Sequence, residues 1–256
     1  MKHPLRTLLL AVCCGLAAAC TQRQERLKLM SYNIRNGIGI DNIQDIDRIA
    51  RVILREAPDL VALQELDSAT LRVDGRYIPG ELGRMTGMHA TFGRAIGFAG
   101  GSYGIGLLSR TEPLAVRSIP LPGREEARVL LMAEFPDYTV CITHLSLTPE
   151  DRLASLPIIR EATDTCRKPV LLAGDFNTGN AAAVLAGLGG FRILSDTTRM
   201  TFPSDNPAVR IDYILGRGLP TSATVAESAV DHTATASDHC PLWVTLVWKR
   251  GKQPGK

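Results

Sequence analysis

Short apolar segments that are followed at once by polar residues recur along this 256-residue chain and restrict its fold more than any other feature. The segments are four to seven residues long, as buried strands are, and turns rich in Gly and Pro separate several of them. Because the last residue of a buried strand lies at an edge of its sheet, the polar residues that follow should gather at sheet edges. The expected strands are residues 27–32, 60–63, 105–108, 114–119, 129–135, 138–143, 170–173, 211–215 and 242–247.

Three further segments have the pattern of helices, and their expected ranges are 43–57, 149–166 and 181–188. The first places apolar residues three and four positions apart, Asp41 or Asn42 can cap its start, and Pro58 should end it. Pro157 should kink the second. Since no internal repeat and no change in composition marks a second domain, we expect one α/β domain over residues 27–248.

The N-terminal residues have the layout of an export signal. A basic start precedes a short apolar run, and the alanines at 17–19 lie directly before Cys20. We therefore expect residues 1–19 to be a signal peptide, Cys20 to be lipidated, and residues 20–26 to tether the domain to a membrane. The protein would then be an exported lipoprotein in the periplasm or on the outer surface. Ordinary signal cleavage without lipidation is the alternative, and it would give a periplasmic or secreted protein.

The charge of the chain is almost balanced. It has 29 basic and 26 acidic residues, and removal of residues 1–19, which hold two basic and no acidic residues, leaves 27 minus 26, or +1. A protein that binds nucleic acid through non-specific phosphate contacts usually carries a larger basic excess, so nucleic acid is a possible but not a favoured partner. Residues 249–256 form a basic tail that we expect to be disordered, and we expect a monomer.

The polar residues at the ends of the strands suit the cleavage of phosphoesters. Such a reaction needs a cation that neutralises the phosphate oxygens and a base that deprotonates water. Oxygen ligands such as those of Glu65 and Asn33 favour Mg²⁺ or Mn²⁺ over Zn²⁺. Capping of turns by Asn33 and Asn177 and a structural ion pair at Asp212 are the alternative interpretations. The candidate residues are Asn33, Glu65, His144, Asp175, Asn177, Asp212, Asp238 and His239.

Seven short motifs resemble those of the endonuclease/exonuclease/phosphatase superfamily and occur in the same order. They are SYNIRNG (31–37), LQELD (63–67), GIGLLSR (104–110), THLS (143–146), AGDFN (173–177), RIDYI (210–214) and SDHCPL (237–242). One such motif is weak support, whereas seven in order are strong support. The resemblance covers residues 27–248. It implies a DNase I-like four-layer α/β sandwich, in which two packed and mostly antiparallel β-sheets are flanked by helices.

The resemblance also implies roles for the candidate residues. Glu65 resembles the main metal ligand of the family, with Asn33 beside it and Asp238 completing the site. The implied cofactor is Mg²⁺ or Mn²⁺. The number of metal ions is left open, because it differs among interpretations of the family.

The remaining candidates resemble the catalytic residues of the family. His239 resembles the general base, or the residue that binds the scissile phosphate, and Asp212 resembles the carboxylate that orients it. Asp175 resembles the residue that activates water or supports the leaving oxygen, and Asn177 the one that hydrogen-bonds the phosphate or the nucleophile. His144 lies where some members have a histidine that contacts phosphate. Whether His239 or Asp175 is the base stays open.

The choice of substrate rests on less specific features. Export, a membrane anchor and near-neutral charge favour a phosphodiesterase or phosphatase that acts on a small or lipid-linked phosphoester outside the cytoplasm. Residues 201–213 also resemble family members that hydrolyse glycolipids and phosphodiesters more than they resemble repair nucleases. A secreted Mg²⁺-dependent nuclease is the alternative, and a non-catalytic binding module is the alternative from another class.

Overall fold

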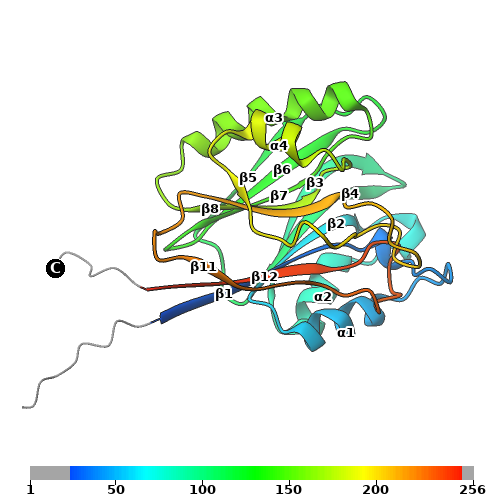
Figure 1. Ribbon diagram of the computed structural model, residues 1–256. Coiled ribbons are helices and arrows are strands. Elements are labelled where there is room, and N and C mark those ends of the chain that lie inside the picture. The colour runs from blue at the N-terminus through cyan, green and yellow to red at the C-terminus, as the bar shows by residue number, and fades with distance from the viewer. Residues whose placement is uncertain (1–23, 250–256) are drawn as a thin grey trace, which may run out of the picture.

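A computed structural model describes residues 24–249, which form two β-sheets packed face to face with helices on both outer sides (Figure 1). The first sheet has the order β11 (Thr224–Val230), β12 (Leu242–Lys249), β1 (Gln24–Asn33), β2 (Leu60–Ser68), β4 (Gly101–Ser109) and β3 (His89–Phe98). The second has the order β5 (Ala115–Leu121), β6 (Arg128–Glu134), β7 (Thr139–His144), β8 (Val170–Asp175), β10 (Asp212–Arg217) and β9 (Arg192–Ile193). The expected four-layer α/β sandwich is confirmed.

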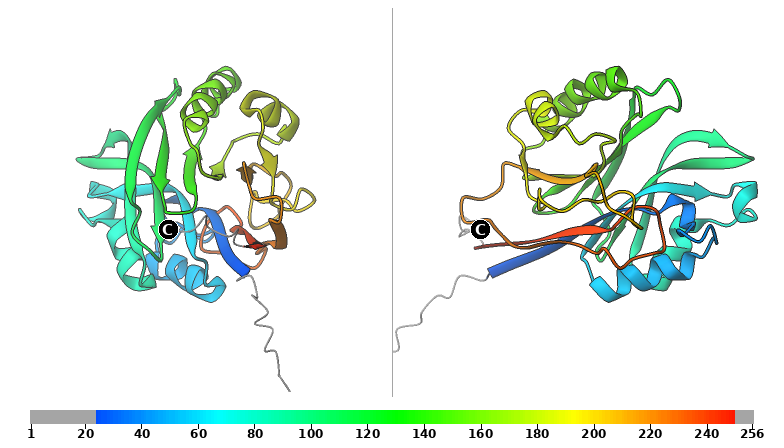
Figure 2. Two further views of the ribbon diagram at one scale, coloured as in Figure 1. Left: turned by 90° about the vertical axis from the view of Figure 1, so that its left-hand side faces the viewer. Right: turned by 45° about the vertical axis from the view of Figure 1, so that its right-hand side comes forward.

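Each sheet is built around one parallel pair. Strands β1 and β2 run parallel, as do β7 and β8, and the other pairings between strands of residues 24–249 are antiparallel. Helices α1 (Ile46–Glu56) and α2 (Ile78–Thr86) cover the first sheet, and α3 (Pro149–Asp164) and α4 (Ala181–Leu188) cover the second (Figure 2). The carboxyl ends of the parallel strands lie side by side within each sheet, and a hydrogen bond from Asn33 to Asp175 joins the end of β1 to the end of β8.

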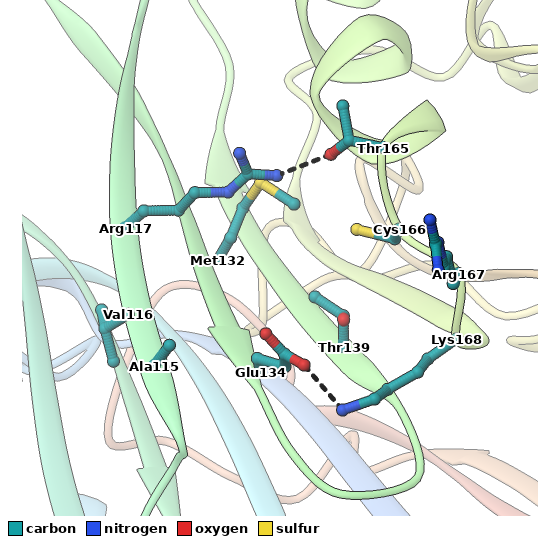
Figure 3. A pocket seen from close by; sticks show the side chains of 10 residues that line it. All are labelled: Ala115, Val116, Arg117, Met132, Glu134, Thr139, Thr165, Cys166, Arg167 and Lys168. Atoms are coloured by element: carbon teal, nitrogen blue, oxygen red, sulfur yellow. Dashed lines mark hydrogen bonds and ion pairs between the residues drawn. The ribbon is translucent and has the colours of Figure 1, made fainter.

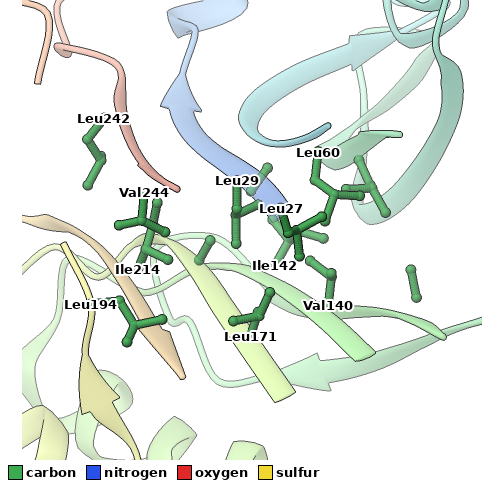
Figure 4. Packing of buried hydrophobic residues seen from close by; sticks show 14 of the residues in the cluster. Leu27, Leu29, Leu60, Val140, Ile142, Leu171, Leu194, Ile214, Leu242 and Val244 are labelled. Carbon is green, nitrogen blue, oxygen red and sulfur yellow. The ribbon is translucent and has the colours of Figure 1, made fainter. Parts of the chain in front are cut away.

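The main core lies between the two sheets and follows from the two-residue period of a strand. Leu27 and Leu29 of β1 face Val140 and Ile142 of β7 in one buried cluster, which also includes Leu171 of β8 (Figure 4). Residues between these positions face the helices and fill two further clusters. Because both faces are covered, the central strands are apolar on both sides, which explains why they were recognisable as continuous apolar runs.

The ends of the domain differ slightly from the expected bounds. β1 begins at Gln24, so residues 24–26 of the expected tether belong to the sheet, where Gln24 pairs with Lys249. The expected signal peptide, Cys20 and most of the expected tail lie outside the described residues. No helix within residues 24–249 is long and apolar enough to cross a bilayer.

The helices show two differences of detail. The side chain of Asp45 caps α1 by accepting a hydrogen bond from the backbone N–H of Arg48, so the predicted caps, Asp41 and Asn42, were wrong. Asp41 instead binds the Arg48 guanidinium. The second expected helix forms as α3 and continues through Pro157.

Four elements were absent from the sequence-based prediction, namely α2, β3, β9 and β11. α2 contains Gly80 and Gly83, which are poor helix formers, and it packs against both the first sheet and α1. Most of β3 and β11 is exposed or half-buried, so neither has the continuous apolar run that marks the central strands.

Candidate active site

On β7 and β8, inward-facing and outward-facing side chains alternate up to the ends of the strands, where polar residues take the inward-facing positions. Two positions after Ile142 and Ala173, on the same faces of β7 and β8, the chain reaches His144 and Asp175. Asp212 begins β10 directly opposite Asp175 in the antiparallel register. Inward-facing positions at the strand ends therefore place catalytic side chains where the apolar filling of the sandwich stops.

Gly174 lets β7 and β8 approach closely beside this edge. Its φ is +153°, and an added Cβ would lie 1.9 Å from the carbonyl oxygen of Thr143. Any side chain here would force the two strands apart. The glycine of the AGDFN motif thus sets the separation of His144 and Asp175, which are partners in the parallel register.

Glu65 reaches the site through a distortion of β2. The strand continues to Ser68 instead of ending at Leu63, and its register with β4 shifts between Leu63 and Leu66. Glu65 lies within that shift and has a φ of 58°, a conformation that non-glycine residues rarely adopt. An irregularity of this kind re-aims a side chain, and here Glu65 is directed toward Asn33.

Asn33 connects three other candidates. Its Nδ2 donates to Oε1 of Glu65 at 3.0 Å and to Oδ2 of Asp175 at 3.1 Å, and lies 3.4 Å from Nε2 of His239. Its Oδ1 accepts a hydrogen bond from the backbone N–H of Arg35. The amide thus occupies the space between two carboxylates.

His239 and Asp212 form a buried pair. Nδ1 of His239 lies 3.0 Å from Oδ2 of Asp212 and donates to it, which leaves Nε2 directed toward Asp175 at 3.7 Å. Burial lowers the pKa of His239, but the charges of Asp212 and Asp175 outweigh it and raise the pKa to about 10. Burial, together with the charge of Asp212, raises the pKa of Asp175 to about 7. Nearby carboxylates thus stabilise the imidazolium form of His239.

His144 has a different partner. Its Nδ1 lies 3.2 Å from Nη1 of Arg128, and its Nε2 lies 3.6 Å from Oδ2 of Asp175. Burial and the positive charge of Arg128 lower the pKa of His144 well below its usual value. The ring is therefore neutral at neutral pH.

The two remaining candidates lie at the margin of the site. The backbone N–H of Asn177 donates to Oδ1 of Asp175, and its side-chain amide donates to the carbonyl of Leu145. Asp238 is partly exposed and forms an ion pair with Arg35 at 3.5 Å. Six candidates therefore lie in contact with one another, namely Asn33, Glu65, His144, Asp175, Asp212 and His239. Asn177 binds Asp175 through its backbone N–H, and Asp238 is partly exposed.

Comparison with known proteins decides the family. The sequence profile described as the endonuclease/exonuclease/phosphatase family matches residues 30–239. The chain belongs to this family. Members hydrolyse phosphoesters and generally depend on a divalent metal, so the chain is of the metal-dependent phosphoesterase type. A comparison with curated protein sequences gave no match.

Solved structures show the same fold at low sequence identity. A Bacteroides vulgatus member of the family shares 19% identity over 88% of this chain and 100% of the other, with a TM-score of 0.71. A mannosyl-6-phosphatase from Bacteroides thetaiotaomicron shares 19% over 87% and 100%, with a TM-score of 0.69. A Beutenbergia cavernae member shares 23% over 88% and 72%, with a TM-score of 0.67.

The site fits a divalent cation of the kind this family uses. Asp175, Asp212 and His239 bring possible ligand atoms within 4.8 Å of one another, although Nδ1 of His239 and Oδ2 of Asp212 already bind each other. The buried Oδ1 of Asp212 has no hydrogen-bond partner among the described residues. Glu65 and Asp175 also converge on the Asn33 amide. Turning this amide would present Oδ1 to the same space and give up the hydrogen bond from Arg35.

The metal ligands predicted from the sequence are Glu65, Asn33 and Asp238. Glu65 and Asn33 face the space in which a cation fits, and Asp175 joins them there. Asp238 is directed toward Arg35 instead. Glu65 and Asp175 follow apolar segments and Asp238 precedes one, and this pattern alone does not show which of them face the same space.

Several supporting residues were not identified from the sequence. Thr201 Oγ1 accepts hydrogen bonds from the backbone N–H groups of Ile211 and Asp212, and the ring of Phe202 lies 4.7 Å from that of His239. The segment that begins at Thr201 was singled out only for its resemblance to other family members, and its position behind the catalytic pair could not be read from it.

A groove of about 510 Å³ lies elsewhere, between β5, β6 and the end of α3 (Figure 3). In it, Lys168 pairs with Glu134, and Arg117 donates to the Thr165 hydroxyl and to the backbone carbonyl of Ala162. The candidate site residues do not line it. We therefore place the chemistry at the sheet edge, not in this groove.

Proposed function

We propose that this chain is an exported phosphodiesterase or phosphatase that uses Mg²⁺ or Mn²⁺ and hydrolyses a small or lipid-linked phosphoester outside the cytoplasm. The convergence of Glu65, Asp175, Asp212 and two histidines at the end of the sandwich, where strands of both sheets contribute, carries this proposal. Oxygen ligands dominate the set, which favours these hard cations over Zn²⁺.

The contacts of each residue indicate its role in the reaction. A bound cation would polarise the phosphoryl oxygens and lower the pKa of water. Glu65, Asp175 and Asn33 would hold it. Asp212 accepts from Nδ1 of His239 and thereby fixes Nε2 as the atom that exchanges a proton on the substrate side. Nε2 of His144 faces Asp175 from the other direction.

The position of β1 determines where a membrane anchor at Cys20 would place the site. β1 begins at Gln24, only four residues after this cysteine, while Asn33 at the other end of β1 contributes to the site. Nine residue steps along a strand span roughly 30 Å. An anchored domain would thus direct its site away from the bilayer, which favours a small soluble phosphoester over a lipid of the same membrane.

A metal-dependent screen tests the activity. Purified protein is treated with EDTA, supplied with Mg²⁺, Mn²⁺ or Zn²⁺, and assayed on sugar phosphates, inositol phosphates, phospholipid vesicles and DNA. We expect no activity after chelation and better recovery with Mg²⁺ or Mn²⁺ than with Zn²⁺. Full activity after exhaustive chelation would contradict the metal requirement. Preferential cleavage of DNA, with binding that weakens steeply with salt, would instead identify a nuclease.

Membrane fractionation tests the anchor. The wild-type protein should sediment with membranes, whereas Cys20→Ser should be soluble or remain uncleaved. Equal solubility of both forms in the exported fraction would exclude the anchor but leave the enzymatic proposal intact.

A further inference from the structure

Arg128 is a buried cation placed directly against one catalytic candidate. It begins β6, which pairs antiparallel with β7, and its side chain reaches His144 at the end of β7. Both side chains are more than nine-tenths buried. Glu125 and Glu126 balance the guanidinium at 3.3 Å and 3.1 Å. Within residues 24–249 neither glutamate hydrogen-bonds to the imidazole, which contacts the guanidinium instead.

The chemistry of the two groups determines where the imidazole proton lies. A guanidinium has only N–H donors, so the atom it contacts must accept. Nη1 of Arg128 contacts Nδ1 of His144 at 3.2 Å, and Nδ1 therefore carries the lone pair. An imidazolium would place an N–H on Nδ1 against the N–H of the guanidinium. The contact thus requires a neutral ring with its proton on Nε2.

We propose that Arg128 is a positioning residue that holds His144 in the Nε2–H form, so that His144 donates a hydrogen bond to the substrate phosphate and cannot act as the base. Nε2 lies 3.6 Å from Oδ2 of Asp175, so the donor is directed into the catalytic site. The role in hydrolysis rests on the proposed function, whereas the tautomer is a property of the protein alone. Proton exchange is thereby assigned to His239, whose Nε2 also lies near Asp175.

Long-range ¹H–¹⁵N correlation spectra of the full chain with labelled histidine test the proposal without substrate. Protonated and unprotonated ring nitrogens resonate well apart, and His144→Gln identifies the signals of His144. We expect Nε2 protonated and Nδ1 unprotonated at pH 7, with and without Mg²⁺. A proton on Nδ1 of His144 in the wild type would overturn the proposal, whatever the activity of the protein.

Variants of Arg128 separate positioning from a purely structural role. In Arg128→Met, Glu125 and Glu126 lose their cationic partner and become acceptors, so a proton should appear on Nδ1. Arg128→Lys keeps a donor and should retain the wild-type ring. Arg117→Met removes a guanidinium from the distant groove and should leave the His144 signals unchanged. An Arg128→Met protein that is folded but keeps the wild-type tautomer would also overturn the proposal.

Kinetics then connect the tautomer to the reaction. On bis(p-nitrophenyl) phosphate with Mg²⁺, Arg128→Met should lower kcat about tenfold, as is typical when a partner that orients a functional histidine is lost, with less effect on KM. Arg128→Lys should recover most of this loss. Undiminished kcat in Arg128→Met would overturn the role in hydrolysis. An inactive wild type with the expected tautomer would contradict the proposed function and leave the tautomer assignment standing.

Discussion

Two histidines lie close to the same carboxylate oxygen of Asp175 and differ mainly in their other partners. Nε2 of His239 and Nε2 of His144 lie 3.7 Å and 3.6 Å from Oδ2 of Asp175, and both rings are buried. Asp212 accepts from Nδ1 of one ring, whereas Arg128 donates to Nδ1 of the other. Burial lowers the pKa of both rings; Arg128 lowers that of His144 further, whereas the charges of Asp212 and Asp175 raise that of His239. The charge of one neighbour thus assigns different chemistry to the same residue type.

The largest expected effect tests the Asp212–His239 side of this comparison. His239→Ala should lower kcat by roughly 10²–10⁴-fold, as expected for a lost proton-transfer group. Asp212→Asn should have a smaller effect, because the imidazole remains but is poorly oriented. The double variant should be little worse than His239→Ala, since residues that act as one unit are strongly non-additive.

Steady-state kinetics on the substrate found in the screen measure these losses. Thermal melts of each variant are the control for folding. Losses that multiply independently in the double variant would mean that Asp212 does not act through His239.

For His144, the comparison predicts that the reaction needs a hydrogen-bond donor at this position and does not need a proton acceptor. The amide nitrogen of a glutamine can occupy the position of Nε2, whereas the shorter asparagine cannot reach it. His144→Asn should lower kcat about 10²–10³-fold, the effect of losing one donor to developing charge, and His144→Gln should lose clearly less. Equal kcat in the two variants would show that the donor at this position is unimportant.

The dependence of stability on pH tests the role of Asp175, the carboxylate that both histidines approach. Without metal, the pKa of Asp175 is raised from near 3.8 to about 7, so its contribution to stability is present below the lower value and is lost as pH rises toward the upper one. The pKa of His239 is raised from 6.5 to about 10, and its contribution is lost over that higher interval. A cation binds only the ionised form of Asp175. Cation binding should therefore offset the stability that is lost when Asp175 ionises.

We therefore expect Mg²⁺ to raise Tm more at pH 8 than at pH 5. Differential scanning fluorimetry of EDTA-treated protein, with and without Mg²⁺, measures the shift. Asp175→Asn is the control, because its amide does not titrate and its response to Mg²⁺ should vary less with pH. A shift in wild-type Tm that is equal at both pH values would argue against Asp175 as a ligand.

The smallest expected effect concerns the support behind Asp212. Thr201→Val removes the hydroxyl that accepts from the backbone N–H groups of Ile211 and Asp212, and keeps the shape of the side chain. We expect a loss of about 1 kcal/mol in the free energy of unfolding. Chemical denaturation measures it, and a simultaneous fall in kcat would show that the Thr201 hydroxyl also orients the catalytic pair. Ser222→Ala, at the far end of the sheet, is the matched control.

The sequence was sufficient for features that depend on local pattern. Apolar runs predicted the central strands, and the two-residue period explains why polar residues at their ends face one site. His144 and Asp175 are examples, since each lies two positions after a core residue on its own strand. The order of seven motifs predicted the family, which the profile match confirms.

Tertiary structure decided the features that depend on distant contacts. α2 and the outer strands form against surfaces that the rest of the chain supplies, so their own residues predict them poorly. Glu65 faces Asn33 because of a shift in register, whereas Asp238 is directed toward Arg35.

The partners of the two histidines show the same limit most clearly. Asp212 lies 27 residues from His239, and Arg128 lies 16 from His144. The sequence by itself determined which side chains reach the sheet edge, because that depends on the period of each strand. Which histidine meets a carboxylate and which a guanidinium depends on strand pairing and loop packing, and only the folded chain brings those groups within hydrogen-bond distance.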